Sequence, residues 1–568
     1  MSQFGPQPRA IGSPKGHSPP GRSIFQPRFQ SPVEFRRMNP LESFELILGL
    51  LAIALVLPII GRRLPLPPAA TLVVGGMVLA AVPGTPSVEL DPDLIMVLFL
   101  PPLLLASAYF TVWRDFRAEL RPIVLLAIGA VTFTTLLVGW VTKQWVPTLP
   151  WGACFALGAI VSPPDAVAAK AILHGLPLPR RIVTILEGES LVNDASGLLL
   201  YRLAVAAVLT GSFHWGAAAA SFVWLGCGGI AFGLVVGRLI SWVFERRKTP
   251  HEVVLISFLA AWFTYIAADR AGISGVLAVV TSGLVTGWHQ HTTVTARGRT
   301  EARAVWRFIV AVFESLVFVL IGLSLRGVLD HFGGLLPGLE AAGPVTLAVI
   351  ATVVISRLLW VFPGVYIPRW LSPALRRRDP APPASSIFVI GWAGMRGVVS
   401  MAAALSLPHD FPGRDVVLFA TFGVIAATVL VQGSTLGLLI RWFVKPAVSE
   451  QTSLLSESAT RAHVASAALS ALEAITGDGG EPRHPQLIEE YRNRVRITTR
   501  VRDHGHEFVE RRQEHFVAAL AAVAAGRTAL VNLHRTGEIH DSILHAIETE
   551  LDLEELRLRQ LAGEGDVA

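Results

Sequence analysis

The sequence predicts an all-α polytopic membrane protein with a helical cytoplasmic tail. Of its 568 residues, 52% are hydrophobic and only 16% are charged, whereas a soluble domain carries about 25% charged residues. Apolar runs of roughly 17–25 residues, each long enough to cross a bilayer, recur along most of the chain. Because these runs are continuous rather than alternating, they favour transmembrane helices over a barrel.

Composition divides the chain into three regions. Residues 1–41 are rich in Pro, Gly and Ser and predict a disordered leader. Its basic charge argues against export, so either translation starts at Met38 or the leader is cytoplasmic and one span is miscounted. Residues 42–445 form the membrane domain. Residues 446–568 contain no apolar run that we expect to span a membrane, and they predict a soluble helical tail that we expect to be regulatory.

The membrane domain is expected to contain about thirteen spans, with boundaries uncertain by about 2–4 residues. They are predicted at 43–61, 68–83, 94–112, 122–141, 152–173, 184–210, 215–244, 252–268, 272–288, 304–325, 344–366, 386–407 and 415–443.

Loop charge orients these spans in a plasma or inner membrane. Numbered from the first, the odd loops carry nearly all of the loop arginines and lysines; the even loops hold only Lys143, Arg270, Arg326 and Arg414. The positive-inside rule therefore places the odd loops and the C-terminal tail in the cytoplasm, and the start of the first span outside.

Several function classes receive no support. Cys154 and Cys227 both fall inside predicted spans, which argues against a disulfide framework and against a metal cluster. The net charge of +6 follows from where the arginines lie and does not indicate nucleic-acid binding. No phosphate-binding glycine loop is apparent, and we expect neither a cofactor nor an enzymatic activity.

Acidic residues at the head of the sixth span are the first candidate site. Glu187, Ser190 and Asp194 recur at helical spacing and share one face, while Glu189 and Asn193 share an adjacent face. Asp194 lies deepest in the apolar run. A carboxylate within a membrane span indicates an ion or proton site, and Asp194 could hold a proton or a dehydrated cation, though not easily both.

The fifth span contains Ser162-Pro163-Pro164-Asp165. Two prolines remove backbone donors and break a helix, and the freed carbonyls are tolerated at membrane depth only where backbone is buried or lines a cavity. Asp165 lies at this break. The alternative is a simple kink in which Asp165 caps the second half-helix.

Glycines at 391, 394 and 397 surround Arg396 in the twelfth span and predict a second interruption. Spans five and twelve are seven apart and therefore antiparallel. Two interrupted antiparallel spans are typical of inverted-repeat transporters with a site at the midplane.

The remaining buried charges need partners. We expect Arg357 to pair with Glu189 or Glu187, Arg396 to lie near the ion path, and Glu314 to serve as a structural partner.

Together these motifs resemble the sodium/proton exchanger family, the first monovalent cation:proton antiporter group, over roughly residues 42–445. The residues that carry the resemblance are Phe99-Leu100-Pro101-Pro102-Leu103-Leu104-Leu105, Ser162-Pro163-Pro164-Asp165-Ala166-Val167-Ala168, Gly188-Glu189-Ser190-Leu191-Val192-Asn193-Asp194, Gly394-Met395-Arg396-Gly397-Val398 and Val431-Gln432-Gly433-Ser434-Thr435-Leu436.

The resemblance implies a homodimer whose protomers each have a dimerisation domain and a six-helix core domain. It implies that Asp194 binds Na⁺ or H⁺, that Asp165 and Ser190 help to ligate the cation with backbone oxygens near Val161 and Ser162, and that Asn193 positions the site. A Glu189–Arg357 ion pair would support it. The Asn193-Asp194 pair implies electroneutral exchange.

The chain departs from the family pattern at two positions. Ala106 stands where many relatives have an acid after the Leu-Pro-Pro segment, and Pro164-Asp165-Ala166 lacks the threonine of the usual Thr-Asp-Pro-like element. Cation preference is therefore less predictable. The expected function is alternating-access exchange of Na⁺ or another alkali cation for H⁺, with K⁺/H⁺ exchange, a cation channel and an intramembrane aspartyl protease as alternatives.

Overall fold

The computed structural model describes residues 40–61, 66–82, 92–165, 178–211, 215–247, 249–443, 457–475, 483–503, 509–536 and 538–562. The leader before residue 40 and its Met38 lie outside these ranges. Regular elements in the described ranges are all helical. The chain divides into two compact units, Met1–Ala447 and Val448–Ala568.

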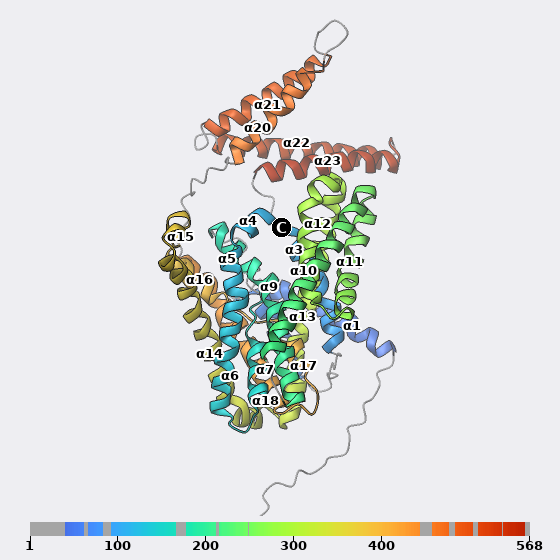
Figure 1. The fold of residues 1–568 in the computed structure, drawn as a ribbon. Helices are drawn as coiled ribbons and strands as arrows, with labels where there is room; N and C mark the ends of the chain where they lie inside the picture. The colour runs from blue at the N-terminus through green and yellow to red at the C-terminus, as the bar shows by residue number, and fades with distance from the viewer. Residues whose placement is uncertain are drawn as a thin grey trace, which may run out of the picture. The chain divides into compact units, whose positions relative to one another are not determined.

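The first unit is a bundle of long helices (Figure 1). Its elements are α1 (Pro40–Gly61), α2 (Pro68–Ala81), α3 (Pro92–Phe110), α4 (Trp113–Ala118), α5 (Leu120–Val124), η1 (Leu125–Ala130), α6 (Val131–Trp145), α7 (Trp151–Val161), α9 (Arg180–Thr210), α10 (Trp215–Arg246), α11 (Pro250–Arg270), α12 (Gly275–Thr293), α13 (Ala296–Phe332), α14 (Leu335–Leu371), α15 (Pro373–Arg378), α16 (Ala384–Trp392), α17 (Val398–Leu405), α18 (Arg414–Ala427), η2 (Thr428–Gln432) and α19 (Gly433–Phe443).

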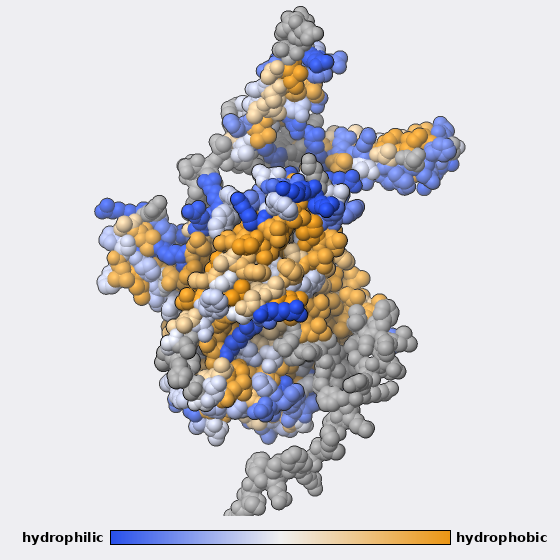
Figure 2. Space-filling model, turned by 45° about the vertical axis from the view of Figure 1, so that its right-hand side comes forward, coloured by the Kyte–Doolittle hydropathy of each residue, from blue (hydrophilic) through white to orange (hydrophobic). Residues whose placement is uncertain are grey.

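Helices occupy every range in which the sequence predicts a span. In the described part of the chain, 8 helices are long and apolar enough to cross a membrane, and four shorter apolar helices accompany them. A hydrophobic belt covers the face of this unit seen in Figure 2, with hydrophilic residues gathered at its two rims. Because apolar side chains remain exposed over this belt, the bundle suits a lipid rather than an aqueous surround.

Glycines allow the helices of this bundle to approach closely. Gly229, Gly233 and Gly237 follow each other at four-residue steps along α10, and an added Cβ at each would meet a backbone carbonyl of α12 or of its N-cap Ser274 at 2.5–2.9 Å. Gly76 of α2 and Gly322 of α13 face each other in the same way. Small residues at such spacing are the usual basis of helix association in membranes, where burial from water supplies no driving force.

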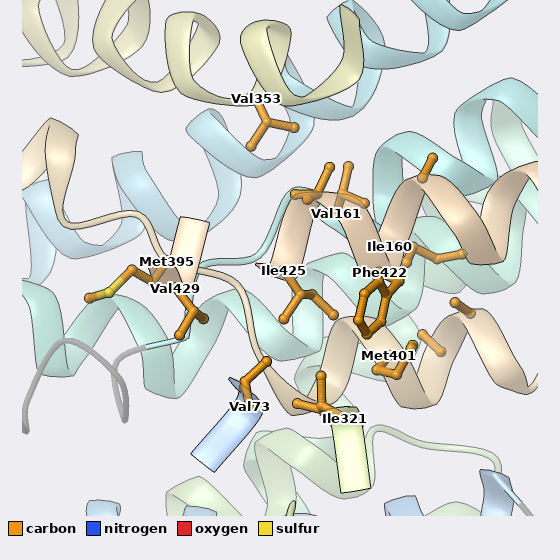
Figure 3. Packing of buried hydrophobic residues seen from close by; sticks show 14 of the residues in the cluster. Val73, Ile160, Val161, Ile321, Val353, Met395, Met401, Phe422, Ile425 and Val429 are labelled. Atoms are coloured by element: carbon orange, nitrogen blue, oxygen red, sulfur yellow. The ribbon is translucent and has the colours of Figure 1, made fainter. Parts of the chain in front are cut away.

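Two clusters of buried side chains divide the bundle. The larger one brings together α2, α6, α7, α13, α14 and α16–α19. Figure 3 shows Val73 of α2, Ile321 of α13 and Met401 of α17 converging within it on Phe422 and Ile425 of α18. The second cluster joins α3, α10, α11 and α12 with the beginning of α13 and one face of α9. Helix α9 contributes side chains to both clusters, so it lies between them.

Two interruptions break helices of the first unit where the sequence predicts them. Helix α7 ends at Val161, and residues 162–165 are not helical; residues 166–177 lie outside the described ranges. Helix α16 ends at Trp392, and α17 starts at Val398 after five non-helical residues, 393–397.

The second unit contains α20 (Glu457–Glu473), α21 (Pro485–Asp503), α22 (Val509–Arg535) and α23 (Asp541–Ala562). Helices α22 and α23 pack together through ion pairs of Arg527 with Asp552 and Glu555 at 2.6 and 2.7 Å. Hydrogen bonds from Arg527 and Arg559 lower the pKa of Glu555. The sequence was expected to contain no run in this tail long enough to span a membrane, and this expectation is wrong. The stretch Phe516–Arg535 is long enough and apolar enough to cross a bilayer. Its alanines raise the hydropathy, whereas Arg527 within it is paired.

Candidate functional site: a carboxylate cavity beside two broken helices

The two interruptions meet. The backbone N–H of Asp165 donates a hydrogen bond of 2.6 Å to the carbonyl of Met395, so the two non-helical segments satisfy part of each other's backbone. Gly397 closes the contact, because a Cβ at this position would overlap the carboxylate of Asp165. Only glycine gives the second segment this close an approach to Asp165.

Arg396 fills the crossing. Its side chain is 1% exposed, and it donates hydrogen bonds to the carbonyls of Val161 at 2.9 Å and Ser162 at 3.3 Å, as well as to that of Gly394. The carbonyls of Val161 and Ser162 lie at the C-terminal end of α7, where unpaired acceptors and the negative end of the helix dipole favour a cation. The guanidinium therefore compensates the broken end of α7.

This arrangement bears on the expected cation ligands. The resemblance implies backbone oxygens near Val161 and Ser162 as ligands, but both carbonyls accept hydrogen bonds from Arg396. Neither residue lines the cavity described below, whereas their neighbours Pro163 and Asp165 do. Arg396 forms no ion pair with a carboxylate within the described ranges, so its contacts are with backbone rather than with Asp194 or Asp165.

A cavity of about 320 Å³ lies beside this crossing. Glu187, Ser190 and Asp194, which the spacing places on one face of α9, all line it. Asp165 enters from the break after α7. Asp194 is 8% exposed, at the buried part of the wall. Carboxyl groups of α9 and of the break after α7, together with the Ser190 hydroxyl, thus line a space large enough for a hydrated or partly dehydrated ion, and oxygen atoms are the ligands that hard cations prefer.

Glu314 of α13 lines the same cavity from the opposite helix, together with Arg307 and Trp306. The structure therefore places Glu314 in the cavity wall. Ala106 of α3 lines it too, so the alanine that replaces the family's acid faces the carboxylates and contributes no ligand.

Asn193 connects the acidic helix to the break. Its side-chain Nδ2 donates a hydrogen bond of 2.7 Å to the carbonyl of Pro164, which lies in the non-helical segment after α7. The side chain is fully buried, and its Oδ1 accepts no hydrogen bond from the residues that the structure describes. An amide oxygen is thus held next to Asp194 in sequence and at the crossing in space.

Glu189 points away from the cavity. Both of its carboxylate oxygens accept hydrogen bonds from Arg357 of α14, at 2.5 and 2.8 Å, and both side chains are almost completely buried. Arg357 also donates to the carbonyl of Ile390 near the end of α16, at 3.1 and 3.3 Å. Of the two partners left open by the sequence, the structure selects Glu189. The pair ties α9 to α14 and α16.

Two hydroxyl groups at the crossing, and a third farther along α9, are not predicted by the sequence. Thr428, in the π-helical η2, accepts a 3.1 Å hydrogen bond from the backbone N–H of Arg396, and Thr135 contacts Ser162 at 3.1 Å. Ser196 donates to the carbonyl of Ala127 in η1. π-helical turns occur frequently at functional sites. The only signal in the sequence was a hydroxyl within an apolar run, which is common and unspecific.

A family model described as "Sodium/hydrogen exchanger, transmembrane" matches residues 51–442. An uncharacterised Na⁺/H⁺ exchanger of Mycobacterium tuberculosis (strain ATCC 25618 / H37Rv) is 32% identical over 526 residues, 90% of this chain and 95% of that protein. The sodium, potassium, lithium and rubidium/H⁺ antiporter of Bacillus subtilis (strain 168) is 33% identical over 423 residues, 70% of this chain and 62% of that protein.

The fold is similar to that of the sodium proton antiporter MjNhaP1 from Methanocaldococcus jannaschii, with a TM-score of 0.57 and 18% identity over 71% of this chain and 99% of that one. The family match covers most of the membrane unit, including both interruptions and the acidic helix α9. The chain belongs to the sodium/hydrogen exchanger family, whose members are multi-pass membrane cation/proton exchangers rather than enzymes.

Proposed function

We propose that this protein exchanges Na⁺ or another alkali cation for H⁺ by alternating access, with Asp194 as the carboxylate that the two ions share. The observation that carries the proposal is the cavity in which Asp194, Asp165 and Ser190 meet beside two broken helices. A site that holds one cation or one proton at a time couples their movements without ATP. A tenfold proton gradient supplies about 1.4 kcal/mol per proton, enough to support a tenfold opposite sodium gradient.

Each site residue takes a distinct part in this proposal. Asp194 binds the passing ion, with Asp165 and Ser190 as further oxygen ligands. Asn193 does not line the cavity, and it positions the site by holding the acidic helix to the break through Pro164. Any ligation by the carbonyls of Val161 and Ser162 would have to be shared with Arg396.

The position of the cavity suggests which side it serves. Besides the carboxylates, it is lined by Phe110 and Thr111 at the end of α3 and by Arg307 in the first third of α13. The distribution of loop arginines assigns these helix ends to the cytoplasm. We therefore propose an inward-facing arrangement, with the start of α1 outside and residues 446–568 forming a cytoplasmic regulatory tail.

Further features of the proposal rest on the family resemblance. They are electroneutral exchange through the Asn193-Asp194 pair, a homodimeric assembly, and inverted repeats formed by the first six and last six spans. The crossing of two antiparallel interruptions supports the repeats, since such crossings arise where repeats of opposite orientation meet.

K⁺/H⁺ exchange at the same site is the second candidate. The B. subtilis relative is named for sodium, potassium, lithium and rubidium, and the element Pro164-Asp165-Ala166 lacks the hydroxyl that the family pattern supplies. A site with fewer fixed oxygen ligands discriminates less strongly between Na⁺ and the larger K⁺.

The proposal is tested with the purified full chain in proteoliposomes that contain a pH-sensitive dye. We expect addition of Na⁺, K⁺ or Li⁺ to change the internal pH, and the rate to be the same with and without an imposed membrane potential. The cation with the fastest response identifies the preferred substrate. Absence of any cation-driven pH change between pH 5 and 9 would contradict the proposal, and large currents without pH change would indicate a channel.

A further inference from the structure

A second and larger cavity, of about 880 Å³, lies on the other side of α9. Helices α5, η1 and α9 form one wall, and α10 and α12 form the other. Its lining is mostly apolar, and several lining side chains are also exposed at the outside of the bundle, among them Val223 at 60%, Leu234 at 51% and Trp288 at 55%. The cavity is therefore a groove that opens sideways toward the hydrocarbon of the bilayer, and its volume is typical of a ligand site.

Charged side chains stand at two levels of this groove. Arg202 is paired with Asp269 at 3.1 Å, so this level is neutral. Arg238 of α10 contacts Nε2 of His289 at 2.7 Å, while Nδ1 of His289 lies 2.8 Å from the carbonyl of Val285. A guanidinium only donates, so Nε2 of His289 must accept and Nδ1 must donate. His289 therefore offers Arg238 an acceptor but no negative charge, so it does not compensate the guanidinium.

Arg238 forms no ion pair with any residue that the structure describes. It lies eight residues before Arg246, the last residue of α10, or roughly 12 Å along the helix. The loop charges assign this end of α10 to the cytoplasmic side. An uncompensated cation at this depth of a membrane protein indicates a binding function, and basic pockets between spans on the cytoplasmic side bind anionic lipid head groups.

We propose that this groove binds one anionic phospholipid of the inner leaflet, with an acyl chain between α9 and α10 and its phosphate at Arg238. Charge complementarity favours this occupant, because an anionic head group supplies the counter-charge that Arg238 does not receive from the described residues, and the exposed apolar side chains of α10 that line the groove, such as Val223 and Leu234, suit an acyl chain. Helix α9 lies between the groove and the ion site, so a bound lipid can influence the ion site through this helix. Val192, Ala195 and Leu199 line the groove, whereas Glu187, Ser190 and Asp194 line the carboxylate cavity.

Binding can be measured without transport. The purified full chain, freed of lipid, is incubated with phosphatidylglycerol and phosphatidylcholine of identical acyl chains, and bound lipid is counted by native mass spectrometry. We expect phosphatidylglycerol to be retained in preference. Arg238→Gln should reduce that preference by roughly fivefold, the effect of one charge at a membrane surface, and Arg238→Lys should keep it. Arg246→Gln on the same helix is the matched control, because Arg246 stacks on Trp242 outside the groove.

Two further variants locate the acyl chain. Gly226 lines the groove and has open space at its Cβ position, so Gly226→Leu should fill the groove without a clash and reduce retention of both lipids. Gly216→Leu is the control, since Gly216 of α10 also has open space but does not line the groove. Cys227 is exposed and lines the groove, whereas Cys154 is buried, so bound phosphatidylglycerol should slow the reaction of Cys227 with N-ethylmaleimide.

The proposal is overturned if Arg238→Gln retains phosphatidylglycerol as the unaltered chain does, or if phosphatidylglycerol binds without protecting Cys227. A groove covered by a second copy would leave Cys227 unreactive in the lipid-free dimer, and Gly226→Leu would then dissociate the dimer; that result also refutes lipid binding. None of these readouts depends on exchange activity, so failure here is distinguishable from failure of the proposed function.

Discussion

Arg357 donates two hydrogen bonds, 2.5 and 2.8 Å long, to the carboxylate of Glu189, and both side chains are almost completely buried. The same arginine donates to the carbonyl of Ile390, two residues before α16 ends. One ion pair thus joins the acidic helix α9 to the helix that leads into the second interruption. Its geometry fixes the position of α9 while leaving Asp194, five residues farther on, to face the cavity.

Loss of either partner of this pair should destabilise the protein strongly. Glu189→Gln leaves the Arg357 charge buried without a counter-charge, a change that costs about 3–5 kcal/mol. We expect a large fall in the thermal unfolding midpoint of the purified protein in detergent. Glu301→Gln, which removes an exposed i,i+4 pair with Arg297, should cost about 0.5 kcal/mol or less. Equal shifts of the unfolding midpoint for the two variants would show that the buried pair stabilises the protein no more than an exposed one.

Neutralising Asp194 should abolish exchange without unfolding the protein. Asp194→Asn keeps the shape of the side chain but removes the charge that binds a cation and the group that carries a proton. In everted vesicles, we expect no pH response to added alkali cation. Asp330→Asn, near the end of α13 and outside the cavity lining, serves as the control and should keep normal activity. A normal pH response from Asp194→Asn would refute the assignment of the shared carboxylate.

Gly397 should tolerate no side chain if Asp165 is to keep its place. A methyl group at this position overlaps the Asp165 carboxylate, which can move aside because it is the end of a flexible side chain. Gly397→Ala should therefore fold but exchange at least about tenfold more slowly, since a displacement of about 1 Å in a positioned group is that damaging. Exchange rates in proteoliposomes test this. Gly343→Ala, whose nearest neighbours lie at 3.9 Å, should be unaffected.

The packing of α2 against α13 should be sensitive to the side-chain volume at their crossing. A Cβ at Gly322 would meet the backbone of Val73 and Gly76, so Gly322→Val must push the helices apart, at a cost of about 1–3 kcal/mol or more. Gly327 lies on the same helix with open space around its Cβ position, and Gly327→Val is the matched substitution. We expect only the first to lower the unfolding midpoint and the yield of folded protein. A comparable loss in both would point to helix propensity instead of packing.

The sequence alone determined the helical ranges of the membrane unit, the two interruptions and the helix face that carries Glu187, Ser190 and Asp194. These features are local: continuous apolar runs predict helices, proline pairs and glycine clusters break them, and helical spacing assigns faces. In the tail, Phe516–Arg535 has the length and hydropathy of a span where the sequence was expected to contain none, because its many alanines raise the mean hydropathy of the stretch.

Only the tertiary structure decided which groups meet. It selected Glu189 rather than Glu187 for Arg357, directed Arg396 to the carbonyls of Val161, Ser162 and Gly394, and brought Thr428 and Thr135 to the crossing. It also placed Arg238 at the end of a groove that no local pattern indicates. The physical reason is that each of these contacts joins residues far apart in the chain, and their pairing depends on how helices pack, which residue spacing within one helix does not specify.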